Sequence, residues 1–421
     1  MATQLKQFEL EQRDHLTENA GLSTGPVPIA PYYCPDFFER EKKQIFERAW
    51  LLVCREEELA APGSFVVKEL PPTSVNALIT RSKSGKIQAF HNTCSHRGSQ
   101  IVYATEGRQS RFVCPYHRWT YTNEGDLIGV TDEANFFNLD KKQCGLTKIA
   151  TEVWDGWVFL NLQSEPEVSL HEYLGDFRGY FEGYQYRGAE HPIVFEADLN
   201  VNWKVLSDAF AETYHISCIH PGTLSDAFTS SANPYGRLLD AKIFSPHRAV
   251  SMFGNAEYQM KPENRVEQFA AALGERGSVI AAATKEDAAG YLSHPAVNPT
   301  NSASWSMDVN HVFPHVQIDS GPGGFWTHWF WPLSPNRSRY EGRFYMAKPE
   351  TMTERFLQEL YISRVVTTIC EDLTSMERTQ KGLESGGKRF MQLQDSEIAI
   401  RHHVEQCVRW VEAESVREAL S

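Results

Sequence analysis

The pattern of hydrophobic and polar positions divides the chain into two regions of different texture. Near the start, residues 36–50 place apolar side chains at helical spacing, which predicts an amphipathic helix. Between residues 63 and 162, short apolar runs are separated by Gly, Pro, Asn and Asp, which is typical of strands joined by turns. The strands expected here cover residues 64–68, 75–80, 87–90, 111–113 and 157–162. This first region is therefore predicted to form a β-rich domain.

The second region combines strand patterns with helical ones. Alternating positions over residues 304–319 and 324–346 predict antiparallel strands, whereas residues 352–383 and 397–413 have the periodicity of long helices. Residues 263–288 are rich in Ala, Glu and Gln and also predict helix, within a stretch that we interpret as an insertion or lid. Strands accompanied by long helices indicate an α+β fold, with an antiparallel sheet backed by helices.

We predict three parts within this α+β organisation. Residues 1–44 form an N-terminal arm and helix that packs on the second domain, residues 45–163 form the β-rich domain, and residues 164–421 form the helix-backed sheet domain. Four of the ring-bearing residues on one expected strand either line a pocket or pack in the core. Core packing is favoured, because aromatic side chains dominate protein cores. These residues are Trp326, His328, Trp329 and Trp331.

Composition and charge narrow the possible partners. At 421 residues, of which 41% are hydrophobic, the chain is long enough for two domains. The formal net charge of −13 argues against nucleic acid or an anionic membrane as a partner, because both would repel it. No apolar run approaches the roughly 18–20 residues that a membrane span requires, and the polar start lacks the apolar core of a secretory signal. We therefore expect a soluble cytoplasmic protein with mostly reduced cysteines.

Two short segments of the β-rich region each supply one thiol and one imidazole. They are Cys94-Ser95-His96 and Cys114-Pro115-Tyr116-His117, with 17 residues between His96 and Cys114. A Rieske [2Fe–2S] cluster needs this set, since two cysteines hold one iron and two histidines hold the other. Structural zinc is the alternative, but zinc sites usually take a cysteine pair from one segment and a histidine pair from another. The mixed segments favour the Rieske cluster, and with it electron transfer.

A second group of possible metal ligands begins at Asp208. In a continuous helix, Asp208, Glu212 and His215 would share one face. His220 would be rotated away, but Pro221 after it disfavours helical geometry, so that His215 and His220 converge if the helix ends between them. Two histidines and one carboxylate with open positions form the facial triad of mononuclear non-haem Fe(II) oxygenases.

The third ligand of such a triad has to come from elsewhere in the chain. A later predicted helix offers three candidate acids, Glu371, Asp372 and Glu377. The helical periodicity does not distinguish between them, and a solvated helix face would explain all three equally well.

These motifs together resemble the large (alpha) subunits of Rieske non-haem iron oxygenases, the ring-hydroxylating oxygenase family. The resemblance covers nearly everything from residue 36 onward. The two Cys/His segments match the family's cluster motif, and Glu212, His215 and His220 match its iron motif. In the family the third iron ligand is an aspartate in the late helix, and the resemblance assigns this role to Asp372.

The resemblance also implies a role for an acid that precedes the first iron histidine. In the family this acid, usually an aspartate, links the Rieske cluster of one subunit to the iron of its neighbour. The matching residue is Glu212, with Asp208 as the second candidate. Glutamate at this position is found in relatives that oxidise quaternary ammonium compounds. The family's usual Glu-Asn pair is replaced by Asp208-Ala209, which removes an amide that many relatives place near iron.

The resemblance implies a terminal oxygenase component with a [2Fe–2S] Rieske cluster and a mononuclear Fe(II). Such a protein uses O2, and electrons from an NAD(P)H-dependent reductase and in some systems a ferredoxin, to hydroxylate or oxidatively dealkylate a small organic molecule. An aromatic substrate is favoured, and a quaternary ammonium compound is the alternative. The family implies a homotrimer, with or without a small beta subunit. A Rieske electron carrier or ligand-binding protein without catalytic iron is the alternative of another class.

Overall fold

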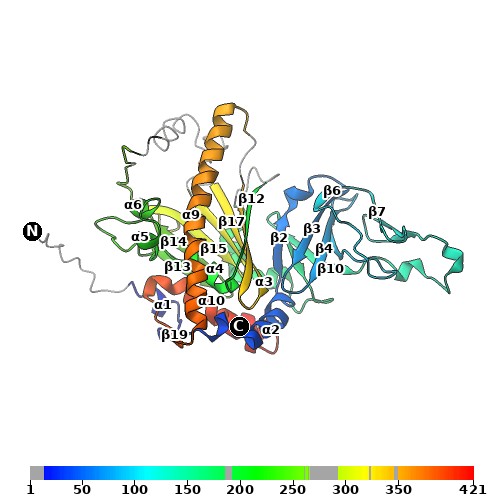
Figure 1. Ribbon diagram of the computed structural model, residues 1–421, viewed down its shortest axis with the longest axis horizontal. Coiled ribbons are helices and arrows are strands. Elements are labelled where there is room, and N and C mark those ends of the chain that lie inside the picture. Colours follow the sequence, from blue (N-terminus) through cyan, green and yellow to red (C-terminus); the bar gives the residue numbers. More distant parts are fainter. Residues whose placement is uncertain are drawn as a thin grey trace, which may run out of the picture.

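The computed structural model describes residues 14–184, 192–259, 261–263, 265, 293–321, 324–345 and 349–421. Two β-sheet regions lie beside each other along the long axis of the molecule, with the long helix α9 (Met352–Glu384) crossing the larger one (Figure 1). The predicted helix over residues 263–288 falls almost entirely outside the described residues. The α+β architecture is confirmed, with strands and long helices in the second region and mainly strands in the first.

The first region is built on a seven-stranded antiparallel sheet. Its strand order is β2 (Leu51–Arg55), β11 (Trp157–Asn161), β10 (Lys148–Trp154), β5 (Ile87–His91), β4 (Val75–Arg81), β3 (Ser64–Leu70) and β6 (Glu106–Arg108). A smaller antiparallel sheet of β7 (Arg111–Val113), β8 (Thr120–Thr122) and β9 (Leu127–Gly129) extends from it towards the far end of the molecule (Figure 1). The five strands expected here are all present, and their ends differ from the expected ones by at most two residues.

The second region is built on a seven-stranded antiparallel sheet of longer strands. Its strand order is β12 (Ile193–Leu199), β18 (Arg337–Phe344), β17 (Gly324–Ser334), β16 (Val316–Gly321), β15 (Trp305–Val312), β14 (His247–Phe253) and β13 (Asp240–Phe244). Each of the two expected strand runs contains two strands, because residues 313–315 and 335–336 turn the chain back on itself.

Helices cover this sheet and connect it to the first region. The helices α9 and α4 (Trp203–Ala209) contact its strands, α3 (Leu170–Phe181) packs on β13 and β14, and α10 (Ile398–Glu412) packs against α4. Both long helices were predicted within one residue of their observed ends. The shorter helices are α1 (Leu16–Asn19), α5 (Ile216–Ile219), α6 (Ser225–Phe228) and α11 (Val416–Leu420), with single turns η1 (Ala30–Tyr32), η3 (Glu56–Leu59), η4 (Glu133–Asn135), η5 (Lys141–Gln143) and η6 (Asp395–Glu397).

The N-terminal segment is tied to the second region. Its strand β1 (Val27–Pro28) pairs with β19 (Phe390–Met391), and its helix α2 (Pro35–Glu41) contacts α10. The helix predicted over residues 36–50 begins as expected, continues as one π-helical turn, η2 (Lys42–Phe46), and ends before β2. Its Glu41 forms a fully buried ion pair of 2.6 Å with Lys204 of α4. Breaking one partner of such a pair would leave an uncompensated buried charge.

Candidate iron centres

Two loops with matching geometry carry the four Cys/His residues of the first region. Cys94 and His96 follow β5, and Cys114 and His117 follow β7. In each loop the cysteine carbonyl accepts from the N–H four residues on, Gly98 at 2.9 Å and Arg118 at 3.0 Å. Each cysteine N–H donates to the carbonyl five residues on, at 2.8 Å in both loops. The backbone is left-handed at the same place in both turns, which glycine supplies in the first loop (φ +76°) and Arg118 adopts in the second (φ +62°).

This symmetry brings like donor atoms together. The Nδ1 atoms of His96 and His117 lie 3.1 Å apart. The thiols of Cys94 and Cys114 interact with each other, and burial together with this interaction raises the pKa of Cys94. A sulfur pair beside a nitrogen pair is the donor arrangement that a Rieske cluster requires, with both cysteines on one iron and both imidazoles on the other. The four residues therefore fit that cluster.

Aromatic side chains enclose the inner side of these loops. The hydroxyl of Tyr121 lies 3.2 Å from the Cys94 sulfur and accepts from the Ser95 N–H at 3.0 Å. Trp119, which is 3% exposed, stacks on the His96 ring with centroids 5.0 Å apart. The sulfur side of the site is thus dry and hydrogen-bonded, while His96 and His117 are only half-buried.

The second group of ligands meets at the ends of a four-residue helix. The continuous helix that would place Asp208, Glu212 and His215 on one face is not formed, because α4 ends at Ala209 and a turn separates it from α5. His215 occupies the N-cap of α5 and His220 its C-cap, where the backbone leaves helical geometry as expected (φ −114°). Their ring centroids are 5.4 Å apart.

Asp372 of α9 completes this group. Its Oδ1 lies 2.8 Å from His220 Nε2 and 3.4 Å from His215 Nε2. One ligand atom from each residue falls within 4.8 Å of the others, and no other group of three such residues in the described part of the chain meets that limit. These are the donors of a two-histidine, one-carboxylate site.

The outer nitrogen of each histidine is held by a further carboxylate. Glu212 Oε1 bonds His215 Nδ1, and its other oxygen accepts from the His215 backbone N–H at 3.2 Å. Glu371 lies 2.7 Å from His220 Nδ1 and also accepts from the Thr223 hydroxyl at 2.7 Å. Carboxylates at Nδ1 fix the tautomer that leaves each Nε2 free to bind a metal ion.

The electrostatics of this group favour a bound cation. Burial lowers the pKa of His215, but the bonds to Asp372 and Glu212 outweigh it and raise the pKa to about 10. Burial raises the pKa of Asp372, and the two histidines outweigh it and lower the pKa. Three carboxylates surround the two imidazoles, and their negative charge is otherwise neutralised by protons on the histidines. A bound divalent cation would neutralise the same charge.

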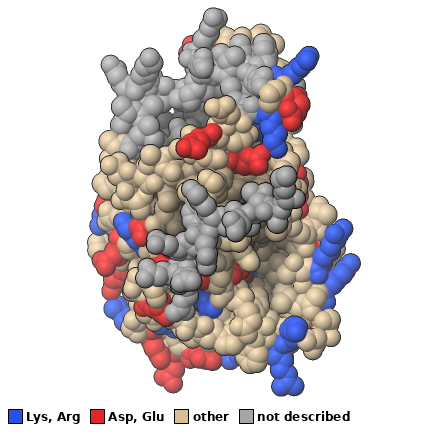
Figure 2. Space-filling model, turned by 90° about the vertical axis from the view of Figure 1, so that its left-hand side faces the viewer, with Lys and Arg blue, Asp and Glu red and all other residues tan. Residues whose placement is uncertain are grey.

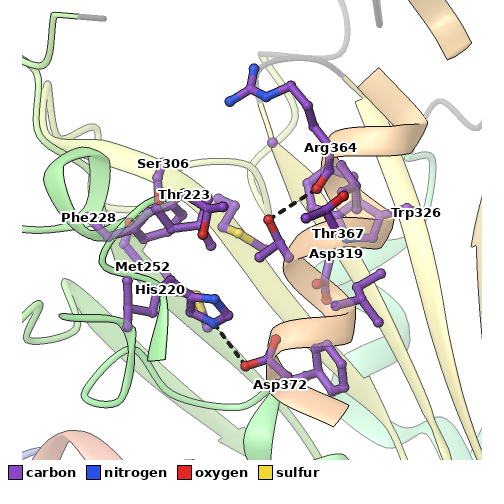
Figure 3. Close-up of a pocket in the computed structure, with 18 of the residues that line it drawn as sticks. His220, Thr223, Phe228, Met252, Ser306, Asp319, Trp326, Arg364, Thr367 and Asp372 are labelled. Atoms are coloured by element: carbon purple, nitrogen blue, oxygen red, sulfur yellow. Dashed lines mark hydrogen bonds and ion pairs between the residues drawn. The ribbon is translucent and has the colours of Figure 1, made fainter. Parts of the chain in front are cut away.

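A cavity of about 580 Å³ opens beside these ligands. Its walls come from α4, α5, α6, the sheet strands β14 to β17 and one side of α9 (Figure 3). Most of the lining is apolar, and the polar lining includes Thr223, Ser306, Asp319 and His328. The apolar side chains include Phe210, Ile216, Leu224, Phe228, Met252 and Trp326. Such a cavity can hold a small, largely apolar molecule against the metal ligands.

The other acids that the sequence offered lie elsewhere. Asp208 does not line the cavity; its carboxylate accepts from the Tyr32 hydroxyl and lies 3.0 Å from His403 Nδ1. Glu377 accepts from the backbone and side chain of Asn200. Of the three candidate acids on α9, only Asp372 faces both histidines, while Glu371 contacts the far side of one of them.

Three cavity residues were not assigned to the cavity from the sequence. Asp319 received no role, and the prediction of core packing for the ring-bearing residues of β17 is only half right. Trp329 and Trp331 are buried, 0% and 6% exposed, whereas Trp326 and His328 line the cavity. Alternation along β17 places the two pairs on opposite faces of the strand, but a strand pattern does not say which face borders a cavity.

The exposed surface is mixed in charge. Acidic and basic side chains are interspersed among uncharged ones on the face shown in Figure 2. In the part of the chain that the structure describes, no helix has both the length and the apolar character to cross a bilayer.

Comparisons with known proteins agree with both centres. Residues 49–145 match the Rieske [2Fe-2S] domain family, and residues 185–413 match the family described as ring hydroxylating alpha subunit (catalytic domain). These two matches imply a Rieske cluster in the first region and a mononuclear iron in the second, which the donor sets described above fit.

Individual relatives match over part of their length. The chain is 31% identical to the glycine betaine monooxygenase oxygenase subunit of Pseudomonas aeruginosa over 195 residues, 46% of this chain and 44% of that protein. It is 33% identical to the N,N-dimethyl phenylurea N-demethylase subunit alpha of Sphingobium sp. over 294 residues, 61% of this chain and 62% of that protein. In these comparisons the chain spans about half the length of the curated relatives it matches.

The fold matches over almost the whole chain. The structure of naphthalene 1,2-dioxygenase from Rhodococcus sp. bound to indole superposes with a TM-score of 0.72 at 20% identity, covering 95% of that chain and 93% of this one. Because the ring-hydroxylating match extends over more than half of the sequence and follows a Rieske domain, the chain belongs to the family of ring-hydroxylating alpha subunits.

Proposed function

We propose that this protein is the terminal oxygenase component of a multi-component Rieske oxygenase. It uses O2, and electrons delivered from NAD(P)H by a reductase, to hydroxylate or oxidatively dealkylate a small organic molecule. The observation that carries this proposal is the meeting of His215, His220 and Asp372 at the wall of a mostly apolar cavity. An electron carrier would need neither the three ligands nor the cavity, so the alternative without catalytic iron is disfavoured.

The proposed ligand sets divide the chemistry between two places. Cys94, His96, Cys114 and His117 would hold the cluster, and His215, His220 and Asp372 would hold the iron. When bound, the cluster supplies single electrons and the ferrous ion activates O2. Glu212 and Glu371 orient the two histidines, and the apolar side chains of the cavity exclude bulk water from the reacting molecule.

The two centres of one chain lie too far apart to cooperate directly. The loops beside β7 and the helix α5 are at opposite ends of the molecule (Figure 1). We therefore propose a homotrimer in which the cluster of one subunit serves the iron of the next. Glu212, already bonded to His215 Nδ1, is the proposed link between them, because a carboxylate can accept from one imidazole on each side of an interface. The proposed domain limits are residues 45–163 and 164–421.

For the substrate we favour an aromatic compound, because Phe210, Phe228 and Trp326 line the cavity. A quaternary ammonium compound is the second candidate. It is supported by Glu212 at the linking position and by the similarity to a glycine betaine monooxygenase subunit.

The first test is to load the protein anaerobically with iron and sulfide and to measure metal content. Two cluster irons plus one further iron per chain are expected, with the reduced-state EPR signal of a histidine-ligated cluster. Benzoate-like acids, naphthalene and betaines are then offered with NADH and a reductase. Oxidation of an aromatic compound is expected. Consumption confined to betaines would replace the aromatic assignment, and a protein that holds only the cluster would contradict the oxygenase assignment.

The second test is Glu212→Gln, which keeps an acceptor beside His215 but removes the charge that the link requires. Both metals should stay bound, while reoxidation of the cluster in the presence of substrate and O2 slows by roughly 10- to 100-fold. Stopped-flow absorbance follows this step. Glu397→Gln, which alters a nearby carboxylate that caps η6, is the matched control. Normal reoxidation in Glu212→Gln would refute the linking role.

A further inference from the structure

Asp319 of β16 lies in the wall of the cavity and is 2% exposed. One of its oxygens, Oδ2, lies 3.0 Å from Nε2 of His328, and Nδ1 of His328 lies 2.6 Å from the Tyr340 hydroxyl. A carboxylate only accepts, so Nε2 carries the proton that is donated to Asp319. Phe210 stacks on the His328 ring at 4.5 Å, which fixes its orientation. The chain of hydrogen bonds thus starts in the core and ends at Asp319.

The other oxygen of this carboxylate, Oδ1, has no hydrogen-bond partner among the residues that the structure describes. The indole of Trp326 lies nearby but does not complete a hydrogen bond to Oδ1. A buried acceptor without a partner costs free energy, which a donor from outside the chain can recover. Figure 3 draws Asp319 among the side chains that surround the cavity, together with Asp372 and Trp326.

The surroundings favour a hydrogen-bond donor over a permanent cation at this oxygen. His328 already donates to the carboxylate and withdraws part of its negative charge. A quaternary ammonium group has no N–H and would leave Oδ1 unsatisfied, whereas an N–H or O–H group would complete the hydrogen-bond chain.

We propose that the substrate carries an N–H or O–H group that donates to Oδ1 of Asp319, while its apolar part faces the His215–His220 side of the cavity. This inference rests on the proposed function, because it names the substrate class of the same cavity. Asp319 is then a binding residue that fixes which atoms of the substrate face the metal ligands. A site built to bind a donor rejects the analogue that lacks it, since the acceptor is left unpaired.

The test compares pairs of probes that differ only in the donor. Indole is paired with 1-methylindole, and phenol with anisole, and binding to the iron-loaded protein is measured anaerobically by titration calorimetry. The donor-bearing member should bind at least about tenfold more tightly to the wild-type protein, as expected for a hydrogen bond to a charged group. In Asp319→Leu the two members should bind within about threefold of each other. Asp319→Asn, which keeps a carbonyl acceptor, should give an intermediate ratio.

A matched control separates this role from a structural one. Asp308 of β15 is as deeply buried, but its two oxygens accept from Ser251 and from the Asn298 N–H, and it does not line the cavity. Asp308→Asn should lower the unfolding temperature without changing the probe ratios. If Asp319→Leu does not fold, the affinity ratio of each probe pair in Asp319→Asn tests the proposal instead.

Three results would overturn the proposal. The first is equal binding of both members of each pair, or no binding of either. The second is an unchanged affinity ratio within each pair in the Asp319 variants. The third is tighter binding of benzyltrimethylammonium than of any donor-bearing probe. Because no turnover is measured, these results are independent of the oxygenase assay. A donor preference that depends on Asp319 would stand even if no probe were oxidised.

Discussion

The two proposed iron centres use opposite nitrogens of their histidines. At the loops beside β5 and β7 the Nδ1 atoms of His96 and His117 converge, which turns their Nε2 atoms outward. At α5 the Nε2 atoms of His215 and His220 converge on Asp372, while carboxylates hold their Nδ1 atoms. The first arrangement leaves an imidazole edge free to contact another protein, and the second locks both rings in place. Under the proposed function, this difference suits one centre to passing electrons between proteins and the other to holding a reacting molecule in place.

Their surroundings differ in the same sense. Tyr103, Tyr116 and Phe137 in the Cys/His loop region are 69%, 57% and 99% exposed, so the cluster loops present apolar surface to solvent. At the second centre His220 and Asp372 are 1% and 6% exposed. Exposed aromatic residues are common at protein interfaces, whereas a buried polar site beside a cavity suits a small ligand.

Removing one ligand from each centre gives the largest expected effect. Cys114→Ser should abolish the visible absorption of the cluster but keep one iron per chain, and Asp372→Ala should do the reverse. Each should lower turnover more than about 100-fold, because even the partners of metal ligands contribute 10- to 100-fold to affinity. Iron quantitation and EPR follow the two centres separately. Cys144→Ser and Glu377→Gln change residues of the same two regions that lie outside the ligand sets. Both variants should keep the cluster and the single iron. Loss of both centres in either ligand variant would contradict their independence.

A smaller effect is expected from Glu371→Gln at the second centre. The amide can still meet His220 or Thr223 but cannot hold the imidazole as a carboxylate does. Iron affinity should fall by roughly tenfold while the cluster is unaffected. Competition with a chelator measures the affinity, and Thr223→Val, which removes only the second contact of Glu371, should cost less. Equal affinity in Glu371→Gln and the wild type would show that this carboxylate does not orient the ligand.

At the first centre the matching change is Tyr121→Phe, which removes the hydroxyl beside the Cys94 sulfur. Hydrogen bonds to sulfur stabilise the reduced cluster, so the reduction potential should fall. A bond of about 1 kcal/mol corresponds to roughly 40 mV for one electron. Protein-film voltammetry measures the shift. Iron at the second centre should stay unchanged, and an unaltered potential would exclude a tuning role for this hydroxyl.

The smallest effect concerns a histidine of the second region that is not a ligand. His247 lies 3.0 Å from the Tyr173 carbonyl and accepts from the Phe313 N–H, and burial lowers its pKa to about 4. Below pH 6.5 the unfolded chain takes up a proton that the folded chain does not, so stability falls as the pH drops from 6.5 towards 4. The slope is up to about 1.4 kcal/mol per pH unit from this residue.

Urea unfolding at pH 7.5 and 5.5 measures this dependence. His247→Gln, which keeps one donor and one acceptor, should reduce the loss of stability between the two pH values. His171→Gln, at an exposed position of α3, should not change it. Buried His311 and His403 act in the same direction, since burial lowers their pKa values too. An unchanged slope in His247→Gln would assign the acid sensitivity to those residues instead.

The sequence predicted the elements that depend on local periodicity and composition. The helices α9 and α10 and the five strands of the first region were found because their patterns continue over whole turns or alternate regularly. The break between α4 and α5 was not found, since residues 203–220 contain no glycine or proline that would mark it before Pro221. The break is set by tertiary contacts, because Asp208 points into the core towards Tyr32 and His403, whereas Glu212 points towards His215.

The candidate site was predictable only as far as its motifs. Periodicity alone left Glu371, Asp372 and Glu377 equivalent, and the rotation of α9 against α5 separates them. Asp319 could not be found, because its role depends on strand pairing and on His328 of the neighbouring strand. Long-range contacts of this kind leave no local pattern in the sequence.

The helix α9 ties the size of the cavity to the position of the proposed metal ligand. The same 33-residue rod carries Asp372 and the wall from Tyr361 to Ile369, and Gln380 anchors it to Tyr32 and Asn202. A shift of α9 that made room for a bulkier molecule would also move Asp372 away from His215 and His220. Under the proposed function, a change of substrate that keeps the three ligands in place would therefore require exchange of single side chains or reshaping of the wall opposite α9.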